Sequence, residues 1–294
     1  MAPLRIATRG SRLALWQAER VAALLGGDAE LVVVSTTGDE RTDVPIWTIG
    51  GTGVFVKEVE QAVLDGRADL AVHSAKDLPS ETAAGLALAA VPERADPRDA
   101  LVGARLDGIP AGGTIGTGSV RRQAQLAALR PDVRFQSIRG NIETRIGKAG
   151  GEVDAVVVAL AALERLGLTG RVAEVLDPAV MLPQVAQGAL AVECRAGDDE
   201  TAGRLAALDD PAARRAVDAE RAFLRRLGGG CDLPCGALAE ARPDGTVALE
   251  VLLATLDGKT VLRVRQEGAD PEAVGAAAAR ILLDERGGRD LLTS

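Results

Sequence analysis

The sequence predicts an α/β fold with two lobes, followed by a small α+β domain. Before Asp210-Pro211, short apolar runs bounded by glycine or polar residues alternate with helical patterns. Such alternation implies βαβ units and a largely parallel sheet. After Asp210-Pro211 the pattern changes to an arginine-rich helix and two strands joined around Asp257-Gly258, which is a strong hairpin signal.

The α/β part divides where the chain is expected to pass between the lobes. The segment 93–104 is charged and interrupted by Pro97, and the run 189–194 resembles a strand that returns to the first lobe. The expected domains are therefore 1–92 with 189–208, 93–188, and 209–294. The expected strands are 4–8, 31–35, 70–74, 134–138 and 153–159, and the expected helices are 11–26, 54–66, 211–227 and 271–284.

Composition narrows the class of protein. With 47% apolar and 26% charged residues, the chain should fold as a soluble globular protein. No run reaches the roughly 20 apolar residues of a membrane helix, and the first residues lack the apolar core of a signal peptide. Three cysteines are too few for a disulfide framework, which favours the cytoplasm. The net charge of −8 argues against nucleic-acid binding, and the single histidine excludes a histidine-rich zinc site, so no metal is expected.

Three turns share a pattern that favours an anionic ligand. Each follows an expected strand and contains glycine, then serine or asparagine as an N-cap, then a helix: 6–11, 115–122 and 137–145. A helix start presents backbone N–H groups and the positive end of the dipole. Arginine on such a turn opposes the dipole unless something negative compensates, and its fork matches a carboxylate. Between residues 117 and 148 there are seven basic and two acidic residues, so the predicted ligand carries several carboxylates or phosphates.

A fourth segment, 69–80, ends a strand with His73, Lys76 and Asp77. In an arginine-rich site a carboxylate is the scarce acid–base or cation-stabilising group. Asp77 is therefore the candidate catalytic residue, with a plain surface pair with Lys76 as the alternative. For His73 we expect a packed structural role. The glycine-rich loop 36–58 is either a lid or a disordered segment, and the sequence does not separate the two.

The stretch LGGGCDLPCGA, residues 227–237, places Cys231 on a bare glycine turn. Either this cysteine is a small hydrophobe after the end of a helix, or another molecule must reach its sulfur. Glycines leave room for a bulky chain, and a thiolate is a good attachment point. The spacing from Cys231 to Cys235 is not that of the C-x-x-C redox motif, so a thiol redox enzyme is disfavoured.

Nine segments in order resemble the porphobilinogen deaminase (hydroxymethylbilane synthase) family, over nearly the whole chain. They are RIATRGSRLALWQA, GGTGVFVKE, ADLAVHSAKDLP, ERADPRDAL, GTGSVRRQAQL, RGNIETR, AALERLGL, LPQVAQGALAVECR and GGGCDLP. No single segment would suffice, but nine in the same order are highly specific.

The resemblance implies a fold and an activity. The fold would be two periplasmic-binding-protein-like α/β domains plus a small α+β C-terminal domain that carries the cofactor cysteine. The activity would be a transferase reaction of porphyrin and heme biosynthesis. In it, four molecules of porphobilinogen condense stepwise to hydroxymethylbilane, and ammonia leaves at each addition. A monomeric cytoplasmic enzyme with neither a membrane nor a nucleic-acid partner is expected.

The resemblance also assigns residues. Cys231 matches the cysteine that holds a dipyrromethane cofactor through a thioether, whereas Cys194 and Cys235 do not match it. Asp77 matches the catalytic aspartate, since a fixed carboxylate near the pyrrole N–H groups stabilises the cationic carbon left when ammonia departs. Lys57 would belong to a loop over the cleft. The residues implied in binding the carboxylates of cofactor and substrate are Arg9, Ser11, Lys76, Ser119, Arg121, Arg122, Arg139, Arg145 and Arg165.

Three positions depart from the family's pattern. Gly118 stands where a second serine is usual, glycine stands where an acidic residue often precedes the two glycines before Cys231, and Arg12 replaces proline or lysine. None removes a residue that the chemistry requires. The alternative function is a non-catalytic two-lobed protein that captures a small polyanion, although such a binder needs neither the third domain nor Cys231.

Overall fold

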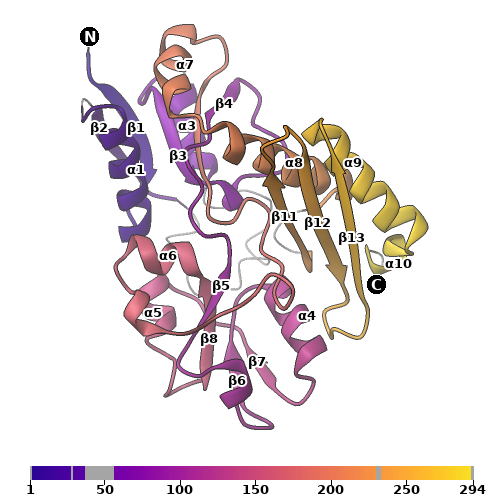
Figure 1. Cartoon of the computed structure of the whole chain (residues 1–294). Helices are drawn as coiled ribbons and strands as arrows, with labels where there is room; N and C mark the ends of the chain where they lie inside the picture. Colours follow the sequence, from indigo (N-terminus) through magenta and orange to yellow (C-terminus); the bar gives the residue numbers. More distant parts are fainter. Residues whose placement is uncertain (1, 28, 37–55, 230–232, 293–294) are drawn as a thin grey trace. The chain divides into compact units, whose positions relative to one another are not determined.

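The computed structural model describes residues 2–27, 29–36, 56–229 and 233–292. Contacts between residues divide the chain, shown in Figure 1, into two compact units. The first comprises Met1–Ala95 and Ala189–Arg214, and the second comprises Asp96–Gly188 and Arg215–Ser294. The second unit thus holds both the expected second α/β domain and most of the C-terminal region. The division into three domains stays a prediction.

The first unit is built on a five-stranded sheet with the order β2-β1-β3-β10-β4. Strand β1 runs parallel to β2 and β3, while β10 runs antiparallel to both β3 and β4. Its strands are β1 (Leu4–Arg9), β2 (Ala29–Val34), β3 (Leu70–Ser74), β4 (Leu86–Ala90) and β10 (Leu190–Arg195). Its helices include α1 (Arg12–Leu24), α3 (Lys57–Leu64) and α7 (Asp199–Leu205). The expected return of the chain through β10 is confirmed.

A second five-stranded sheet, in the second unit, repeats this arrangement with the order β7-β6-β8-β5-β9. Here β6 runs parallel to β7 and β8, and β5 runs antiparallel to β8 and β9. The strands are β5 (Asp99–Val102), β6 (Thr114–Gly116), β7 (Arg134–Gln136), β8 (Ala155–Ala159) and β9 (Val172–Val175). Between them lie α4 (Val120–Leu129), α5 (Ile142–Ile146) and α6 (Leu160–Arg165). Two largely parallel α/β sheets confirm the predicted fold class.

Strand β8, in the middle of the second sheet, is apolar at every position because both of its faces are buried. Val156 and Val158 join one buried cluster, whereas Ala155 and Val157 join the cluster on the opposite face. Successive side chains of a strand point to opposite faces, so both faces must be apolar. This explains why VDAVVVA is a strand that does not alternate in polarity.

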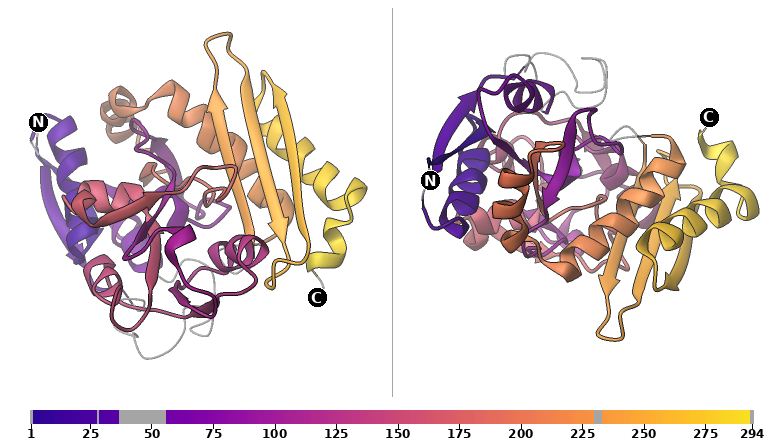
Figure 2. Two further views of the ribbon diagram at one scale, coloured as in Figure 1. Left: turned by 60° about the horizontal axis from the view of Figure 1, so that its bottom comes forward. Right: turned by 90° about the horizontal axis from the view of Figure 1, so that it is seen from above.

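The C-terminal region forms an antiparallel sheet of β11 (Cys235–Ala241), β12 (Val247–Ala254) and β13 (Val261–Gly268). Helix α9 (Pro271–Arg280) packs against β12 and β13, as both views of Figure 2 show. The arginine-rich helix α8 (Pro211–Leu227) precedes the sheet, and α10 (Gly288–Leu292) follows α9. The hairpin and helix α8 are confirmed, and the last expected helix ends as α9 at Arg280, with a π-helical turn over Ile281–Glu285.

Contacts within the second unit hold the C-terminal sheet against α4. Ala124 of α4 shares a buried cluster with Leu252 and Ala254 of β12. At the hairpin tip, a Cβ on Gly258 would lie 2.4 Å from the backbone nitrogen of Ala128. The backbone of the hairpin therefore rests directly on that of the helix, an approach that only glycine permits.

One expected connection is partly wrong. The charge of segment 93–104 and its Pro97 predict a link between lobes, but the segment contains β5, whose four residues are all buried. The strand lies between β8 and β9, so its pairing, rather than its own polarity, determines its structure. The strands β4, β9 and β11 were not predicted, and β6 was expected only as the strand before the turn at 115–122, without bounds.

Replacing Gly258 with alanine should lower the free energy of unfolding by about 3 kcal/mol. The cost combines a strained backbone, since φ is +70°, with a Cβ that overlaps the helix backbone. Gly245 is the matched control, because its φ is +83° and a Cβ at that position would have no neighbour within 4 Å, so Gly245→Ala should cost only about 1 kcal/mol. Urea unfolding of both variants measures the difference, and equal losses would contradict the docking of the hairpin on α4.

Candidate functional site

In the first unit, the ends of two neighbouring strands bring candidate residues together. Strands β1 and β3 run parallel, so Arg9 at the end of β1 and Ser74 at the end of β3 lie at the same edge of the sheet. Ser11 caps α1, as predicted, and its hydroxyl accepts a hydrogen bond from the Ala14 backbone N–H at 3.3 Å. Gln17 of α1 donates to the Ser74 hydroxyl at 2.7 Å. Helix α1 is thereby fixed against the end of β3.

A pocket opens at this edge of the first sheet. Its polar lining includes Arg9, Ser11, His73, Ser74 and Asp77, and its apolar lining includes side chains of α1 and β3. Asp77 ends the short 3-10 turn that follows β3 and is partly buried. The structure therefore places the predicted carboxylate beside the predicted arginine and serine. A carboxylate and a guanidinium in one pocket can hold an anionic group and stabilise a cationic centre at the same time.

His73 lines this pocket and is buried. Its Nε2 lies 3.4 Å from Oε2 of Glu193, on the neighbouring strand β10. Burial, together with the charge of Arg9, lowers the pKa of His73 to about 4. The imidazole is thus neutral near neutral pH, which suits the structural role expected from the sequence.

The two predicted lysines lie on segments adjoining the same strands. Lys76 is partly buried in the turn before Asp77, and Lys57 is the exposed first residue of α3. Most of the glycine-rich loop 36–58, to which Lys57 was assigned, lies outside the described residues.

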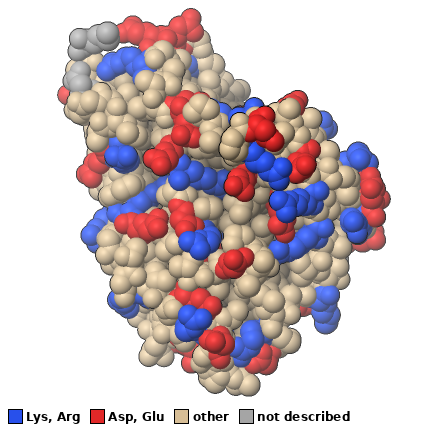
Figure 3. All heavy atoms as spheres, in the orientation of Figure 1, with Lys and Arg blue, Asp and Glu red and all other residues tan. Residues whose placement is uncertain are grey.

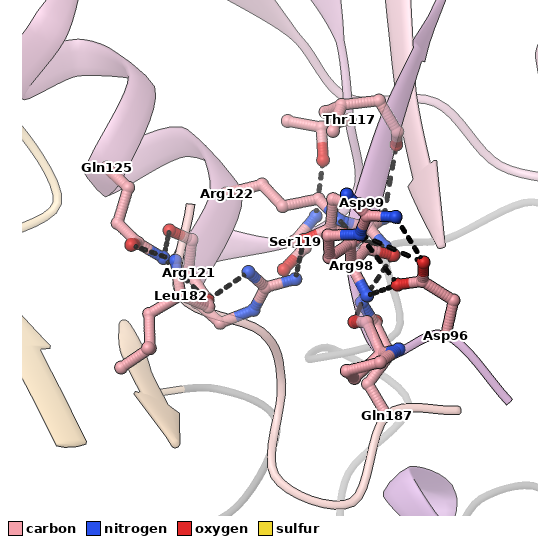
Figure 4. Close-up of polar contacts among 12 residues, drawn as sticks. Asp96, Arg98, Asp99, Thr117, Ser119, Arg121, Arg122, Gln125, Leu182 and Gln187 are labelled. Carbon is pink, nitrogen blue, oxygen red and sulfur yellow. Dashed lines mark hydrogen bonds and ion pairs between the residues drawn. The ribbon is translucent and has the colours of Figure 1, made fainter. Parts of the chain in front are cut away.

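In the second unit, the start of α4 carries Ser119, Arg121 and Arg122. Ser119 occupies the N-cap position but makes no capping hydrogen bond through its side chain. Both arginines are buried, with only 1% and 7% of their surface exposed, and both bind the carboxylate of Asp99 (Figure 4). Burial alone would raise the pKa of Asp99, but the two guanidiniums outweigh it and hold the pKa far below its usual value. Asp99 is therefore charged, and it compensates one of the two arginines.

Further candidate arginines lie after β7 and at the end of α6. Asn141 caps α5, as predicted, and accepts a hydrogen bond from the Thr144 N–H at 2.9 Å. The nearby Arg145 donates to the Gly140 carbonyl at 2.7 Å, and Arg139 is partly buried.

Arg165, at the end of α6, donates to the Gly188 carbonyl at 2.6 Å. Burial lowers the pKa of Arg165 to about 10, so its guanidinium remains charged at neutral pH.

Asp99 and Gln187 were not predicted as parts of this arrangement. Gln187 is fully buried and donates to Asp99 at 2.9 Å. In the sequence, Asp99 resembles one more charge in a charged connection. The signal in the sequence was the apolar run that follows Asp99, Ala100 to Val102, which indicates a buried strand. A carboxylate at the first position of a buried strand needs a cationic partner.

Figure 3 shows lysines and arginines interspersed with acidic side chains on the face drawn. Among the residues that the structure describes, no group of three or more His, Cys, Asp or Glu side chains is placed to hold a metal ion. No helix within the described ranges is long and apolar enough to cross a bilayer.

Comparison with known proteins identifies the family. Residues 4–203 match the family model "Porphobilinogen deaminase, dipyromethane cofactor binding domain", and residues 214–284 match "Porphobilinogen deaminase, C-terminal domain". The chain belongs to the porphobilinogen deaminase family. It is 47% identical to a porphobilinogen deaminase of Syntrophus aciditrophicus (98% of this chain, 97% of that protein) and 49% identical to one of Roseiflexus castenholzii (98% of each).

Membership of the porphobilinogen deaminase family replaces both alternatives, the non-catalytic polyanion binder and the redox enzyme. The family's cofactor domain spans both sheets, and its name specifies a dipyrromethane group. The described residues suit such a polycarboxylate, since arginines gather at helix starts and one carboxylate compensates two buried guanidiniums at α4. Cys231, the predicted attachment residue, lies outside the described residues.

Acidification should destabilise the protein through His73. The unfolded chain binds a proton at a pKa near 6.5 and the folded chain only near 4, so stability is complete above pH 6.5 and falls as the pH drops toward 4. The loss should reach about 3 kcal/mol. His73→Gln, which cannot take up this proton, should show a flatter dependence in urea unfolding. Because the chain has one histidine, its NMR titration is unambiguous, and a pKa near 6.5 in the folded protein would contradict the burial argument.

Proposed function

We propose that this chain carries out the porphobilinogen deaminase reaction with the residues that match the family's motifs. In that reaction four porphobilinogen molecules condense stepwise to the linear tetrapyrrole hydroxymethylbilane, with loss of ammonia at each addition. The observation that carries the proposal is the match of both family models in order, together with a pocket that gathers Arg9, Ser11 and Asp77.

The arginines bind carboxylates in this proposal. Each pyrrole of the substrate carries an acetate and a propionate, so a growing chain needs many cationic partners. Arginine suits this task because its planar fork meets a carboxylate through two hydrogen bonds. In the first unit these groups are Arg9, Ser11 and Lys76. In the second unit they are Ser119, Arg121, Arg122, Arg139, Arg145 and Arg165.

Asp77 stabilises positive charge in the substrate. When ammonia leaves the aminomethyl carbon, the pyrrole becomes a cation whose charge extends to its ring N–H. A fixed, partly buried carboxylate lowers the energy of that state more than water would, because it is already oriented before the charge develops. Asp77 is held by the turn that ends β3 and by the pairing of β3 with β1 and β10, so little reorganisation accompanies the reaction.

Cys231 holds the dipyrromethane cofactor through a thioether. When bound, this group supplies a covalent primer on which the pyrrole chain is extended. The chain's own contribution is the thiol, and the glycines before it leave room for a substituent. The enzyme is further proposed to act in the cytoplasm as a monomer, which cell fractionation and native mass spectrometry test.

The two neighbouring cysteines should differ completely in cofactor attachment. Cys231→Ser should lose the added mass of two linked pyrrole units, because a hydroxyl cannot form the thioether. Cys235→Ser is the matched control and should keep it, because Cys235 opens β11 and is fully buried. Intact mass of the denatured proteins, followed by peptide mapping over 226–242, measures this. An adduct on the Cys231→Ser protein would overturn the assignment.

Asp77→Asn should reduce kcat by about 100- to 1,000-fold while leaving the primer attached. Asparagine keeps the shape of the side chain but removes the charge that offsets the substrate cation. Asp65→Asn is a suitable control, since Asp65 is an exposed acid of the same unit that accepts a hydrogen bond from Gln61. Near-normal turnover of the Asp77→Asn enzyme, with its primer present, would remove Asp77 from this role.

A further inference from the structure

One carboxylate holds two buried guanidiniums at the start of α4. Asp99 Oδ2 accepts a hydrogen bond from Arg121 Nη2 at 2.7 Å, and Oδ1 accepts from Arg122 Nε at 3.1 Å and Nη2 at 2.7 Å (Figure 4). The Asp99 side chain is fully inaccessible to solvent. It therefore cannot touch a substrate, and any effect that it has on the reaction must pass through the arginines.

Gln187 holds the same carboxylate from a distant part of the chain. Its Nε2 donates to Asp99 Oδ1 at 2.9 Å and to the Pro97 carbonyl at 2.8 Å. Asp99 and Gln187 lie close to the first and last residues of the Asp96–Gly188 segment. The carboxylate is thus fixed by its own strand, by α4 and by the segment that leaves this domain.

Backbone carbonyls fix the other ends of the two guanidiniums. Arg121 Nη1 donates to the Leu182 carbonyl at 2.7 Å, and Arg122 Nη1 donates to the Val157 carbonyl at 3.1 Å. The Nε of Arg121 is buried and has no hydrogen-bond partner among the described residues. The cluster therefore keeps one donor and one positive charge in excess, beside a helix start that also favours anions.

We propose that Asp99 is a positioning residue for this reaction: it fixes Arg121 and Arg122, and with them the start of α4, in the arrangement that receives the carboxylates of primer and substrate, and Gln187 locks Asp99 in that role. The inference rests on the proposed function of the two arginines. With the carboxylate present, both guanidiniums are held in one orientation before the ligand arrives, so binding costs little ordering. Without it, two like charges lie side by side in a buried site and repel each other.

A merely structural role would give a different kinetic result. If Asp99 only supported folding, its loss would lower the fraction of active enzyme, so the apparent kcat would fall while KM stayed unchanged. If Asp99 positions the arginines, folded enzyme assembles its primer poorly, and the molecules that carry a primer bind porphobilinogen weakly. The second case raises KM.

The test compares Asp99→Asn with Asp96→Asn in the full-length protein, produced in cells that make porphobilinogen. Asp96 is the matched control, because it lies three residues away and pairs with Arg98 on the partly exposed side of the same segment. The readouts are primer content by intact mass, KM and kcat of the primer-carrying fraction, and the thermal unfolding temperature. We expect folded Asp99→Asn to lose at least tenfold in primer content or to raise KM at least tenfold, with Asp96→Asn close to wild type. Full primer content and unchanged KM in folded Asp99→Asn would overturn the proposal.

Gln187→Ala covers the case in which Asp99→Asn does not fold. This variant keeps both ion pairs of Asp99 and removes only the amide donors, so it should fold and raise KM severalfold with kcat nearly unchanged. An unchanged KM in Gln187→Ala would overturn the inference. The proposed function fails separately, and this inference with it, if wild-type protein shows neither the Cys231 adduct nor turnover.

Discussion

Burying a guanidinium without a counter-charge costs several kcal/mol, and the second unit buries two of them side by side. Asp99 meets this constraint with one carboxylate, and the surrounding structure depends on keeping that carboxylate in place. Strand β5 must begin at Asp99, α4 must begin near Arg121, and Gln187 must reach back from the far end of the domain. One ion cluster therefore ties together a strand, a helix and a connecting segment that are distant in sequence.

The parallel arrangement of strands imposes a second constraint. Neighbouring parallel strands end at the same edge of a sheet, and the segments that follow them meet there. This geometry brings Arg9 and Ser11, at and just after the end of β1, into one pocket with Asp77, which follows β3. The fold thereby holds close together charged groups that would lie far apart in an unfolded chain. The order of the strands in the first sheet, more than any single side chain, therefore determines where this pocket forms.

Two helix caps, a hairpin and a helix could be predicted because their signals lie in neighbouring residues of the sequence. Ser11 and Asn141 were recognised as helix caps, since a side-chain oxygen just before a helix satisfies an N–H within the next turn. The hairpin around Asp257-Gly258 and helix α8 were equally plain. Strand β5 was missed because its signal is not local: Asp99 and Arg98 resemble a loop until β8 and β9 bury the residues that follow. The roles of Arg121 and Arg122 were predicted from charge and family resemblance, which could not reveal that their guanidiniums are turned inward onto Asp99.

The sequence by itself determined the α/β class, the order of the main elements and the family, because periodicity, caps and ordered motifs are properties of neighbouring residues. It also determined which residue types are available for chemistry: many arginines, one histidine and a cysteine on a glycine turn. The tertiary structure decided which of these groups meet. It placed Asp77 in a pocket with Arg9, buried His73 so deeply that it is neutral, and enclosed Arg121 with Asp99. Burial and distance set the charge and orientation of a side chain, and both depend on segments far away in the chain.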